Sequence, residues 1–256
     1  MKNKNINIYE DKNTVQFYEN SQELHETEKK LFDTYLNSSM SILDIGIGAG
    51  RTTRHLIKKC SCYIGIDYSQ KMIESCKAQF PSLELFVVDA TDLSQFKNNQ
   101  FDMVIFSFNG LDYISPDTRR HQCIKEINRV LKKNGTFIFS HHYSKSIYLY
   151  PDLSTPYLSK KLWRTFRSII KTMFIFSKTI ISTAYWKESG YVHDYIHGHG
   201  GLLTYVTTPN KVKKEFSSLG FQITDVMSNL YPKTDNPNAT FWYYYAARKI
   251  NNDIIR

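Results

Sequence analysis

Between residues 41 and 140, short continuous apolar runs alternate with segments in which apolar residues recur at helical spacing. The runs are SILDI (41–45), CYIGI (62–66), LELFVV (83–88), FDMVIFS (101–107) and TFIFSH (136–141). Strands buried on both faces have this continuous apolar character, and helices cover them. Five β–α units in succession predict a doubly wound parallel sheet of the α/β class.

Helical spacing and end signals place three helices between these runs. The segments TTRHLIKKC and SQKMIESCKAQF put their apolar side chains on one face. A third helix is expected to start at Ser115-Pro116-Asp117, with a cap, a proline at the first helical position and an acid near the positive end. It should stop at KKNG, where basic residues precede a glycine.

The alternation ends after residue 140. Residues 141–201 show no clear strand, and we interpret them as an insertion on a completed scaffold. Thr208-Pro209 predicts the start of another helix, and the strands FQITDVMS and TFWYYYAARK predict a hairpin that closes the sheet. The predicted organisation is an N-terminal helical cap (1–40), a core (41–141 and 202–250) and an inserted acceptor lid (142–201).

The formal charge of +9 favours approach to anionic partners, such as phosphorylated or carboxylated small molecules, nucleic acid or an acidic membrane surface. Charge alone does not choose among them. The four cysteines form no C-x-x-C pair, and we interpret them as reduced core residues. No signal-peptide core and no run of about 20 uncharged apolar residues is present, so we expect a cytoplasmic protein.

A glycine-rich turn follows the first predicted strand in LDIGIGAGRTT. Gly46, Gly48 and Gly50 permit a tight turn and close approach of a ligand, and the following helix offers free N–H groups. Two acids, Asp67 and Asp89, end the second and third predicted strands. An acid after the second strand can bind both ribose hydroxyls, which suits NAD and S-adenosylmethionine alike. A nucleotide-like ligand is therefore expected at the carboxyl ends of the strands.

The ordered motifs LDIGIGAGRTT, GIDYSQKMI, VVDATDL and FDMVIFSFNGLDYI, followed by EINRVLKKNGTFIFSHH, resemble the class I S-adenosylmethionine-dependent methyltransferases. The resemblance implies a seven-stranded, mostly parallel sheet of order 3-2-1-4-5-7-6 with the last strand antiparallel. It also implies S-adenosylmethionine as cofactor and S-adenosylhomocysteine as product. The cofactor-binding residues that it implies are Tyr18 near the methionine carboxylate (or Tyr9 in its place), Asp44 supporting the loop, Gly46, Gly48 and Gly50 facing the cofactor, Asp67 on the ribose, Tyr68 and Met72 flanking the adenine, Asp89 and Ala90 at its amine, and Phe106 and Ser107 near the methionine moiety.

The end of the fourth strand, SFNG, differs from the Asn/Asp-Pro-Pro-aromatic pattern of resembling enzymes that methylate nucleic-acid bases, and no Pro-Cys nucleophile of the cytosine-carbon type is present. The motif SFNGLDYI instead resembles the small-molecule branch of the family. Asn109, Asp112 and Tyr113 are candidates for the acceptor pocket, although Asp112 could equally orient the loop. Successive strand residues face opposite sides, so one of His141 and His142 should face the acceptor, and we favour His142 as a base.

The stretch YVHDYIHGHGGLLTY resembles, in its first two histidines, the H-E-x-x-H motif of zinc peptidases. That motif needs a helix, which the surrounding glycines disfavour, so no metal is expected. We interpret the stretch as a glycine-hinged loop over the acceptor. His197 and Tyr205 are candidate acceptor-pocket residues there, and His199 is a second candidate base.

The segment LSKKLWRTFRSIIKTMF (158–174) combines an apolar stripe with five basic residues and no acid. Three hypotheses stay open for it: a helix that caps the sheet or pairs with a partner, a helix on an anionic membrane surface, or a basic face that attracts an acidic acceptor or RNA. Residues 141–205 are expected to form a lid that determines acceptor choice.

The sequence therefore favours a methyltransferase that moves a methyl group to an oxygen or nitrogen of a small molecule, anionic or neutral, mainly by proximity and in-line orientation. The alternative is a basic RNA- or membrane-associated protein, either an RNA or lipid methyltransferase or a non-catalytic binding protein with the same fold. A dehydrogenase ranks third. Nucleic acid is the less favoured partner, peripheral membrane contact stays open, and oligomeric state is not predicted.

Overall fold

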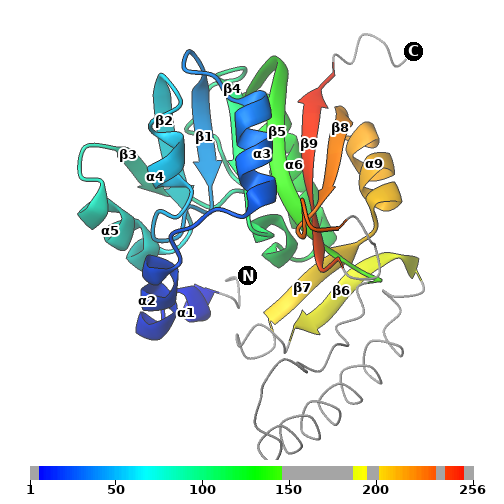
Figure 1. The fold of residues 1–256 in the computed structure, drawn as a ribbon, viewed down its shortest axis with the longest axis horizontal. Helices are drawn as coiled ribbons and strands as arrows, with labels where there is room; N and C mark the ends of the chain where they lie inside the picture. The colour runs from blue at the N-terminus through cyan, green and yellow to red at the C-terminus, as the bar shows by residue number, and fades with distance from the viewer. Residues whose placement is uncertain (1–5, 146–186, 195–201, 235–239, 251–256) are drawn as a thin grey trace, which may run out of the picture.

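The computed structural model describes residues 6–145, 187–194, 202–234 and 240–250. Within these residues, nine strands form one twisted sheet with helices on both faces (Figure 1). The strands are β1 (Ser41–Ile45), β2 (Cys62–Asp67), β3 (Glu84–Val87), β4 (Phe101–Phe106), β5 (Leu131–Tyr143), β6 (Ser189–Asp194), β7 (Leu202–Thr207), β8 (Phe221–Ser228) and β9 (Trp242–Lys249).

The predicted strand order is confirmed. Strands β3, β2, β1, β4 and β5 lie side by side and parallel, and β9 then pairs antiparallel with β5 from Thr136↔Arg248 to His142↔Trp242. Strand β8 pairs antiparallel with β9 at the edge. This arrangement is the predicted order 3-2-1-4-5-7-6, with β8 and β9 as its sixth and seventh strands.

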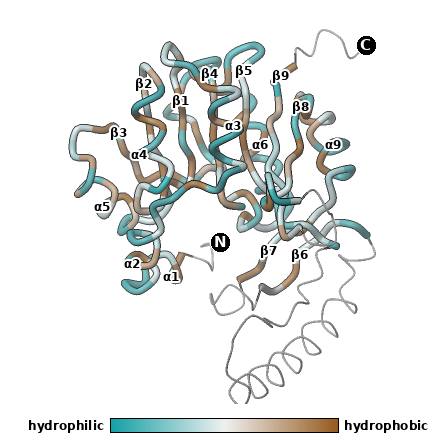
Figure 2. Tube along the Cα trace, in the orientation of Figure 1, coloured by the Kyte–Doolittle hydropathy of each residue, from teal (hydrophilic) through white to brown (hydrophobic). Residues whose placement is uncertain are grey.

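Alternating strand residues build two separate cores. Leu43, Val104 and Phe139 belong to a cluster packed under α6 (Asp117–Val130) and α9 (Pro209–Ser218). Ile42 and Met103 face the other side, where a second cluster packs under α3 (Glu26–Tyr35), α4 (Thr53–Leu56) and α5 (Gln70–Gln79). Hydrophilic residues line the outward faces of helices such as α3 and α9 (Figure 2). The continuous apolar runs in the sequence reflect burial on both faces.

The N-terminal segment forms three helices, α1 (Ile6–Tyr9), α2 (Lys12–Asn20) and α3. Helix α3 begins with a capping box, because the backbone N–H of His25 donates to Oε2 of Glu28 at 2.8 Å. Leu31 and Phe32 anchor this helix in the second core. The two shorter helices lie at the edge of the sheet where the parallel strands end (Figure 1).

Several predicted helix ends differ from the structure. Helix α6 begins at Asp117 with Pro116 as its N-cap, so the predicted Ser115 cap is wrong. The helix ends at Val130 and β5 starts at once, which places the KKNG turn inside an irregular strand. Helix α4 is much shorter than the predicted segment 52–60. The Thr208-Pro209 start is confirmed, since Oγ1 of Thr208 accepts the N–H of Lys211 at 3.4 Å.

The expectation of no strand between residues 141 and 201 is wrong. Strand β6 lies in this range and pairs antiparallel with β7, which in turn pairs parallel with the end of β5. A glycine and polar residues interrupt the apolar pattern of β6, so its partner rather than its own sequence defines it. The basic segment 158–174 lies outside the described residues.

The two ends of the intervening segment meet beside this hairpin. The backbone N–H of Ser144 donates to the carbonyl of Thr207 at 2.9 Å, and its hydroxyl donates to the carbonyl of Glu188 at 3.1 Å. Nζ of Lys145 lies 2.8 Å from a carboxylate oxygen of Glu188. The chain therefore leaves the described structure after residue 145 and re-enters it at the same place.

Candidate active site

A cavity opens at the carboxyl ends of β1, β2, β4 and β5, beside α1 and α2. It is where a nucleotide-like ligand is expected in an open α/β sheet. The predicted site residues that line it are Tyr18, Gly46, Gly48, Asp67, Tyr68, Met72, Asp89, Ala90, Phe106, Ser107, Asn109, Tyr113 and His142. Asp44, Gly50, Asp112 and Tyr205 do not line it, and His197 and His199 lie outside the described residues.

The glycine turn leaves β1 in a left-handed conformation. Gly46 has φ +67° and Gly48 has φ +53°, which glycine adopts without steric cost. A Cβ on Gly46 would lie 2.9 Å from Cε2 of Phe106, whereas one on Gly48 would find its nearest neighbour, Tyr18, at 3.8 Å. The space over Gly48 is therefore open toward the cavity. Gly50 instead packs against Phe80, below the turn.

Asp67 holds the turn from the end of β2. Its carboxylate accepts the N–H groups of Gly48 and Ser69, each at 2.9 Å. Burial raises the pKa of Asp67 to about 6, although these backbone N–H groups lower it. Each carboxylate oxygen keeps a second lone pair, so the group can also accept hydrogen bonds from a ligand.

Asp44 lies under the turn, where it accepts the hydroxyls of Thr52 at 2.6 Å and Tyr63 at 2.8 Å. Burial raises its pKa to about 7, and the two hydroxyls lower it. Its carboxylate supports the turn without reaching the cavity.

The far wall beyond Asp67 combines polar and apolar groups. The hydroxyl of Tyr68 is buried without a hydrogen-bond partner, and Met72 is buried beside it in the cavity wall. Asp89 is half exposed; one of its oxygens accepts the N–H of Thr91 at 2.9 Å and the other lies 2.5 Å from Nη2 of Arg119. An unpaired buried hydroxyl facing a cavity favours a polar ligand there.

Aromatic residues from α1 and α2 cover this part of the cavity. The ring of Tyr9 lies 6.2 Å from Tyr18, 5.7 Å from Tyr68 and 6.4 Å from Tyr113. The hydroxyl of Ser69 donates to the carbonyl of Tyr9 at 3.1 Å, which ties α1 to the cap of α5. The two predicted tyrosines, Tyr9 and Tyr18, therefore both reach the cavity.

A buried ion pair below the cavity escaped the sequence analysis. Nη1 and Nη2 of Arg51 donate to Oε2 and Oε1 of Glu28 at 2.6 and 2.8 Å. Ser107, at the end of β4, also donates to Glu28. The pKa of Glu28 is lowered because Arg51 and these donors outweigh burial, which raises it. The only signal in the sequence was the capping box of α3 and the position of Arg51 directly after the glycine turn.

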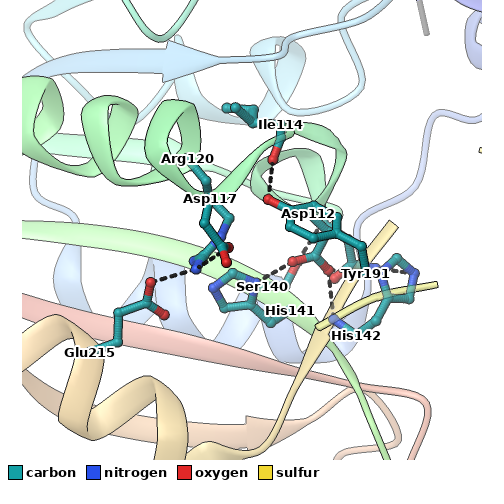
Figure 3. Close-up of polar contacts among 10 residues, drawn as sticks. Asp112, Ile114, Asp117, Arg120, Ser140, His141, His142, Tyr191 and Glu215 are labelled. Carbon is teal, nitrogen blue, oxygen red and sulfur yellow. Dashed lines mark hydrogen bonds and ion pairs between the residues drawn. The ribbon is translucent and has the colours of Figure 1, made fainter. Parts of the chain in front are cut away.

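At the other end of the cavity, Asp112 lies between two imidazoles (Figure 3). Its Oδ1 binds Nδ1 of His141, and its Oδ2 accepts the backbone N–H of His142 and lies 2.7 Å from Nδ1 of the same residue. All three residues are buried. Burial raises the pKa of Asp112, but the two histidines outweigh it and the net pKa is lowered.

His142 and Asn109 line the cavity at this end. Nδ2 of Asn109 lies 3.3 Å from Nε2 of His142, whereas Oδ1 of Asn109 is buried without a partner. The rings of Tyr113 and Trp242 lie nearby, with centroids 6.1 and 6.5 Å from the centroid of the His142 ring. Trp242 was not predicted, because only the β5–β9 pairing brings it opposite His142.

Tyr205 lies behind this end of the cavity instead of within it. Its ring stacks under the guanidinium of Arg120 at 3.8 Å and lies 5.9 Å from His141. Nη2 of Arg120 lies 2.6 Å from Oε1 of Glu215 (Figure 3). The neighbouring Tyr191 donates its hydroxyl to the carbonyl of Ile114 at 2.8 Å. These contacts dock the β6–β7 hairpin against α6 and α9.

The zinc-peptidase interpretation does not fit the backbone. His193 and Asp194 lie in β6, whereas the motif requires a helix. No group of three or more potential metal ligands occurs among the described residues. Across the same residues, no helix has both the length and the apolar character needed to cross a membrane.

Comparison with known proteins finds a matching family for the part of the chain that contains the glycine turn. Residues 42–135 match the family model described as a methyltransferase domain. A protein of Geobacillus sp. (strain WCH70) named as a methyltransferase is 29% identical over 119 residues, which are 45% of this chain and 47% of that protein. The demethylmenaquinone methyltransferase of Leptospira interrogans is 32% identical over 112 residues, 39% of this chain and 41% of that enzyme.

The chain thus spans about half the length of the curated relatives it matches. Among solved structures, the 1,6-didemethyltoxoflavin-N1-methyltransferase of Burkholderia thailandensis, with bound 1,6-didemethyltoxoflavin and S-adenosylhomocysteine, is similar with a TM-score of 0.62. It is 14% identical, and the match covers 96% of this chain and 85% of that one.

Proposed function

The chain belongs to the class I S-adenosylmethionine-dependent methyltransferases, whose cofactor it therefore takes, and we propose that it transfers a methyl group to an oxygen or nitrogen of a small molecule. The predicted resemblance and cofactor are thereby confirmed. The acceptor class and the atom methylated are part of the proposal.

The residues of the cavity fit this cofactor. Open space over Gly48 allows a ligand to approach the turn, and the spare lone pairs of Asp67 suit a ribose diol. Tyr68 offers a buried hydroxyl without a partner, next to Met72 and Asp89. We assign the adenosine part to this end and the methionine part to the region of Ser107 and Tyr18.

One observation carries the proposal: the cavity is continuous from Asp67 and Asp89 to Asn109, Tyr113 and His142. A cofactor at the first end and an acceptor at the second would share one continuous space. S-adenosylmethionine supplies an activated methyl group, so holding an acceptor lone pair in line with it provides most of the rate enhancement. The role of this chain is then to position the acceptor and exclude water.

The composition of the cavity wall favours a small, uncharged acceptor. No lysine or arginine is among the described residues that line it, despite the net charge of +9. A phosphate or carboxylate of an acceptor, beside Asn109, Tyr113 and His142, would therefore lack a lysine or arginine partner among the described residues. This argues against the anionic acceptors left open by the sequence, and nothing in the described cavity favours RNA or lipid.

We further propose that residues 1–40 act as a cap on the cofactor end and residues 142–201 as a lid on the acceptor end. The tyrosines of α1 and α2 support the first assignment, since they lie over the cavity. The docking of β6 and β7 beside η1 (Gly110–Tyr113) supports the second. Under this division, the core carries the cofactor contacts and the lid determines acceptor choice.

The test is calorimetric titration with S-adenosylhomocysteine and with NAD, followed by transfer of labelled methyl to a small-molecule panel and to RNA. We expect S-adenosylhomocysteine to bind, NAD not to bind, and label to enter small molecules. Asp67→Ala should weaken S-adenosylhomocysteine about tenfold or more, or about 1.4 kcal/mol. Asp92→Asn is the matched control, because Asp92 is an exposed acid on the next loop.

Two results would contradict the proposal. Equal binding of NAD and S-adenosylhomocysteine would favour a dehydrogenase instead. Label that enters RNA and no small molecule would replace the acceptor class while leaving the methyltransferase assignment intact.

A further inference from the structure

We propose that Nε2 of His142 is the general base that takes the proton from the acceptor, with Asp112 as its positioning residue, and that the acceptor is an uncharged planar compound carrying an ionisable O–H or N–H. This inference rests on the proposed function and deepens it. It names the chemistry of the acceptor end of the cavity.

The hydrogen bonds around Asp112 fix the tautomer of His142. Oδ2 of Asp112 accepts the backbone N–H of His142 at 2.7 Å, so this oxygen acts as an acceptor toward His142. Nδ1 of His142, at 2.7 Å, must therefore be the donor. A neutral His142 then carries its lone pair on Nε2, which is the nitrogen next to Asn109 and the cavity. This is the arrangement in which a carboxylate orients a histidine base.

The surroundings hold this pair rigidly. His141 and the backbone N–H of His142 donate to the same carboxylate, so Asp112 has donors on both oxygens. The titratable groups around His142 and Asp112 are Tyr113 of η1, His141 of β5 and Tyr245 of β9. Oδ2 of Asp112 lies 2.7 Å from Nδ1 of His142, so the carboxylate would stay in contact with the imidazolium that forms when His142 takes the proton.

Asn109 offers a second contact for the acceptor. Its backbone N–H donates to Oγ of Ser140 at 2.7 Å, and the residue is buried, with 4% of its surface exposed. Nδ2 of Asn109 lies 3.3 Å from Nε2 of His142 and donates to its one lone pair, so an acceptor O–H or N–H must displace this amide contact, while Oδ1 of Asn109 is buried without a partner at the cavity wall. An orphaned buried acceptor costs free energy unless a ligand donates to it.

The shape of this end favours a flat molecule. Tyr113 and Trp242, which also line the cavity, both contact the His142 ring edge-to-face, at interplanar angles of 77° and 67°. Aromatic walls with few polar groups bind planar, uncharged rings. The acceptor group that suits both polar contacts is therefore a phenolic hydroxyl or a ring N–H with a second donor beside it.

The proposed step balances in atoms and charge. The acceptor oxygen or nitrogen forms its bond to the methyl carbon, the carbon–sulfur bond breaks, and its electron pair remains on sulfur. The acceptor proton passes to Nε2 of His142, which becomes an imidazolium beside Asp112. Exchange with solvent after product release restores the neutral base.

The test compares phenol with 4-nitrophenol as probe acceptors for wild type, His142→Gln and Asp112→Asn. Phenol needs a base near neutral pH, whereas 4-nitrophenol can be offered as the phenolate. We expect His142→Gln to lower kcat/KM for phenol about 100-fold, within the range of general-base catalysis, and to change the rate with the phenolate little. Asp112→Asn should lower kcat for phenol more than it changes KM and should alter the rate with the phenolate little, since Nδ1 of His142 loses the carboxylate that orients it. His55→Gln removes an exposed imidazole as a matched control.

A measurement on the wild-type protein keeps the proposal testable if the variants misfold. In the wild-type S-adenosylhomocysteine complex, the absorbance of bound 4-nitrophenol should show ionisation at a lower pH than in solution. Equal losses with phenol and phenolate, or an unchanged ionisation, would overturn the base. Binding of S-adenosylhomocysteine without binding or methylation of either phenol would overturn the acceptor class. Failure of S-adenosylhomocysteine itself to bind would instead refute the proposed function.

Discussion

A buried carboxylate lies at each end of the cavity, Asp67 in its wall and Asp112 behind His142, and burial affects the two differently. Asp67 accepts two backbone N–H groups, and its pKa is raised to about 6. Asp112 binds two imidazoles and one backbone N–H, and its pKa is lowered. Neutral backbone donors offset only part of the cost of burying a charge, whereas partners that can themselves become charged offset more than all of it. The cost of burying the Asp67 charge is thus only partly offset, whereas that of Asp112 is fully offset.

The ends also differ in how the chain assembles them. The cofactor end is a backbone turn held by the next strand, with Gly48 and Asp67 19 residues apart. The acceptor end joins η1, β5 and β9, and its side chains meet only through sheet pairing. A change in the shared support should damage both ends, and a change in either should damage one.

The largest expected effect comes from Glu28, which joins the glycine turn to the end of β4. Glu28→Gln leaves Arg51 buried without its anion, and removing one partner of a buried pair costs about 3–5 kcal/mol. Both S-adenosylhomocysteine binding and methyl transfer should fall with stability. Chemical denaturation measures the loss, and Glu26→Gln, an exposed acid of the same helix paired with Lys29, is the control. Equal stability of the two variants would show that the buried pair does not join the ends.

The next effect is confined to the cofactor end. Gly46→Ala requires a left-handed alanine, at roughly 1–2 kcal/mol, and also places its Cβ 2.9 Å from Phe106. Gly48→Ala has only the first cost in the free protein, since its nearest neighbour is at 3.8 Å. Thermal unfolding should therefore show a larger loss for Gly46→Ala. If Gly48→Ala were as destabilised, contact with Phe106 would not limit the turn.

A titration separates the two carboxylates directly. As the pH drops through about 6, Asp67 gains a proton and the affinity for S-adenosylhomocysteine should fall. Loss of one charged contact of roughly 1.4 kcal/mol corresponds to about a tenfold fall. The variant Asp67→Asn should lack this pH dependence. Calorimetric titrations across this range measure it, and an unchanged profile in the variant would assign the proton to another group.

The same carboxylates should affect stability with opposite signs. The raised pKa of Asp67 means that the folded protein binds this proton more tightly than the unfolded chain, so its contribution is lost as pH rises toward about 6. The lowered pKa of Asp112 gives a contribution that is present above its unfolded value and lost as pH falls. As the pH rises, the free energy of unfolding of the wild type should therefore fall relative to that of Asp67→Asn. Over the same change it should rise relative to that of Asp112→Asn.

The smallest effect concerns the docking of the β6–β7 hairpin. Tyr191→Phe removes the hydrogen bond to Ile114 and should cost about 1 kcal/mol. It should raise the KM for an acceptor without changing S-adenosylhomocysteine affinity. Tyr231→Phe is the control, a tyrosine of the turn after β8. Weaker cofactor binding in Tyr191→Phe would mean that the hairpin supports both ends.

The sequence predicted that the glycine turn and Asp67 lie together because their arrangement depends on local geometry. Glycines with positive φ and acids that end neighbouring strands can be recognised from the sequence alone. The core strands were predictable for the same reason, since burial on both faces produces continuous apolar runs. His142 was a candidate because it follows a predicted strand.

The remaining features depend on contacts between distant segments. Trp242 reaches the acceptor end through pairing with β5, and Arg51 finds Glu28 only when α3 packs on the sheet. Strand β6 has little apolar character of its own and forms against β7. The role of Asp112 as the partner of two histidines required their simultaneous placement, which no spacing in the chain reveals.

The meeting of residues 144–145 with Glu188 gives the intervening segment a narrow neck. In evolutionary terms, a stretch whose ends already touch can be lengthened, shortened or exchanged in one genetic event without shifting the register of β5 or β7. Under the proposed division of the chain, such an exchange would change acceptor choice and leave the glycine turn unaltered. Grafting a relative's segment between residues 145 and 188 would carry out such an exchange in one step.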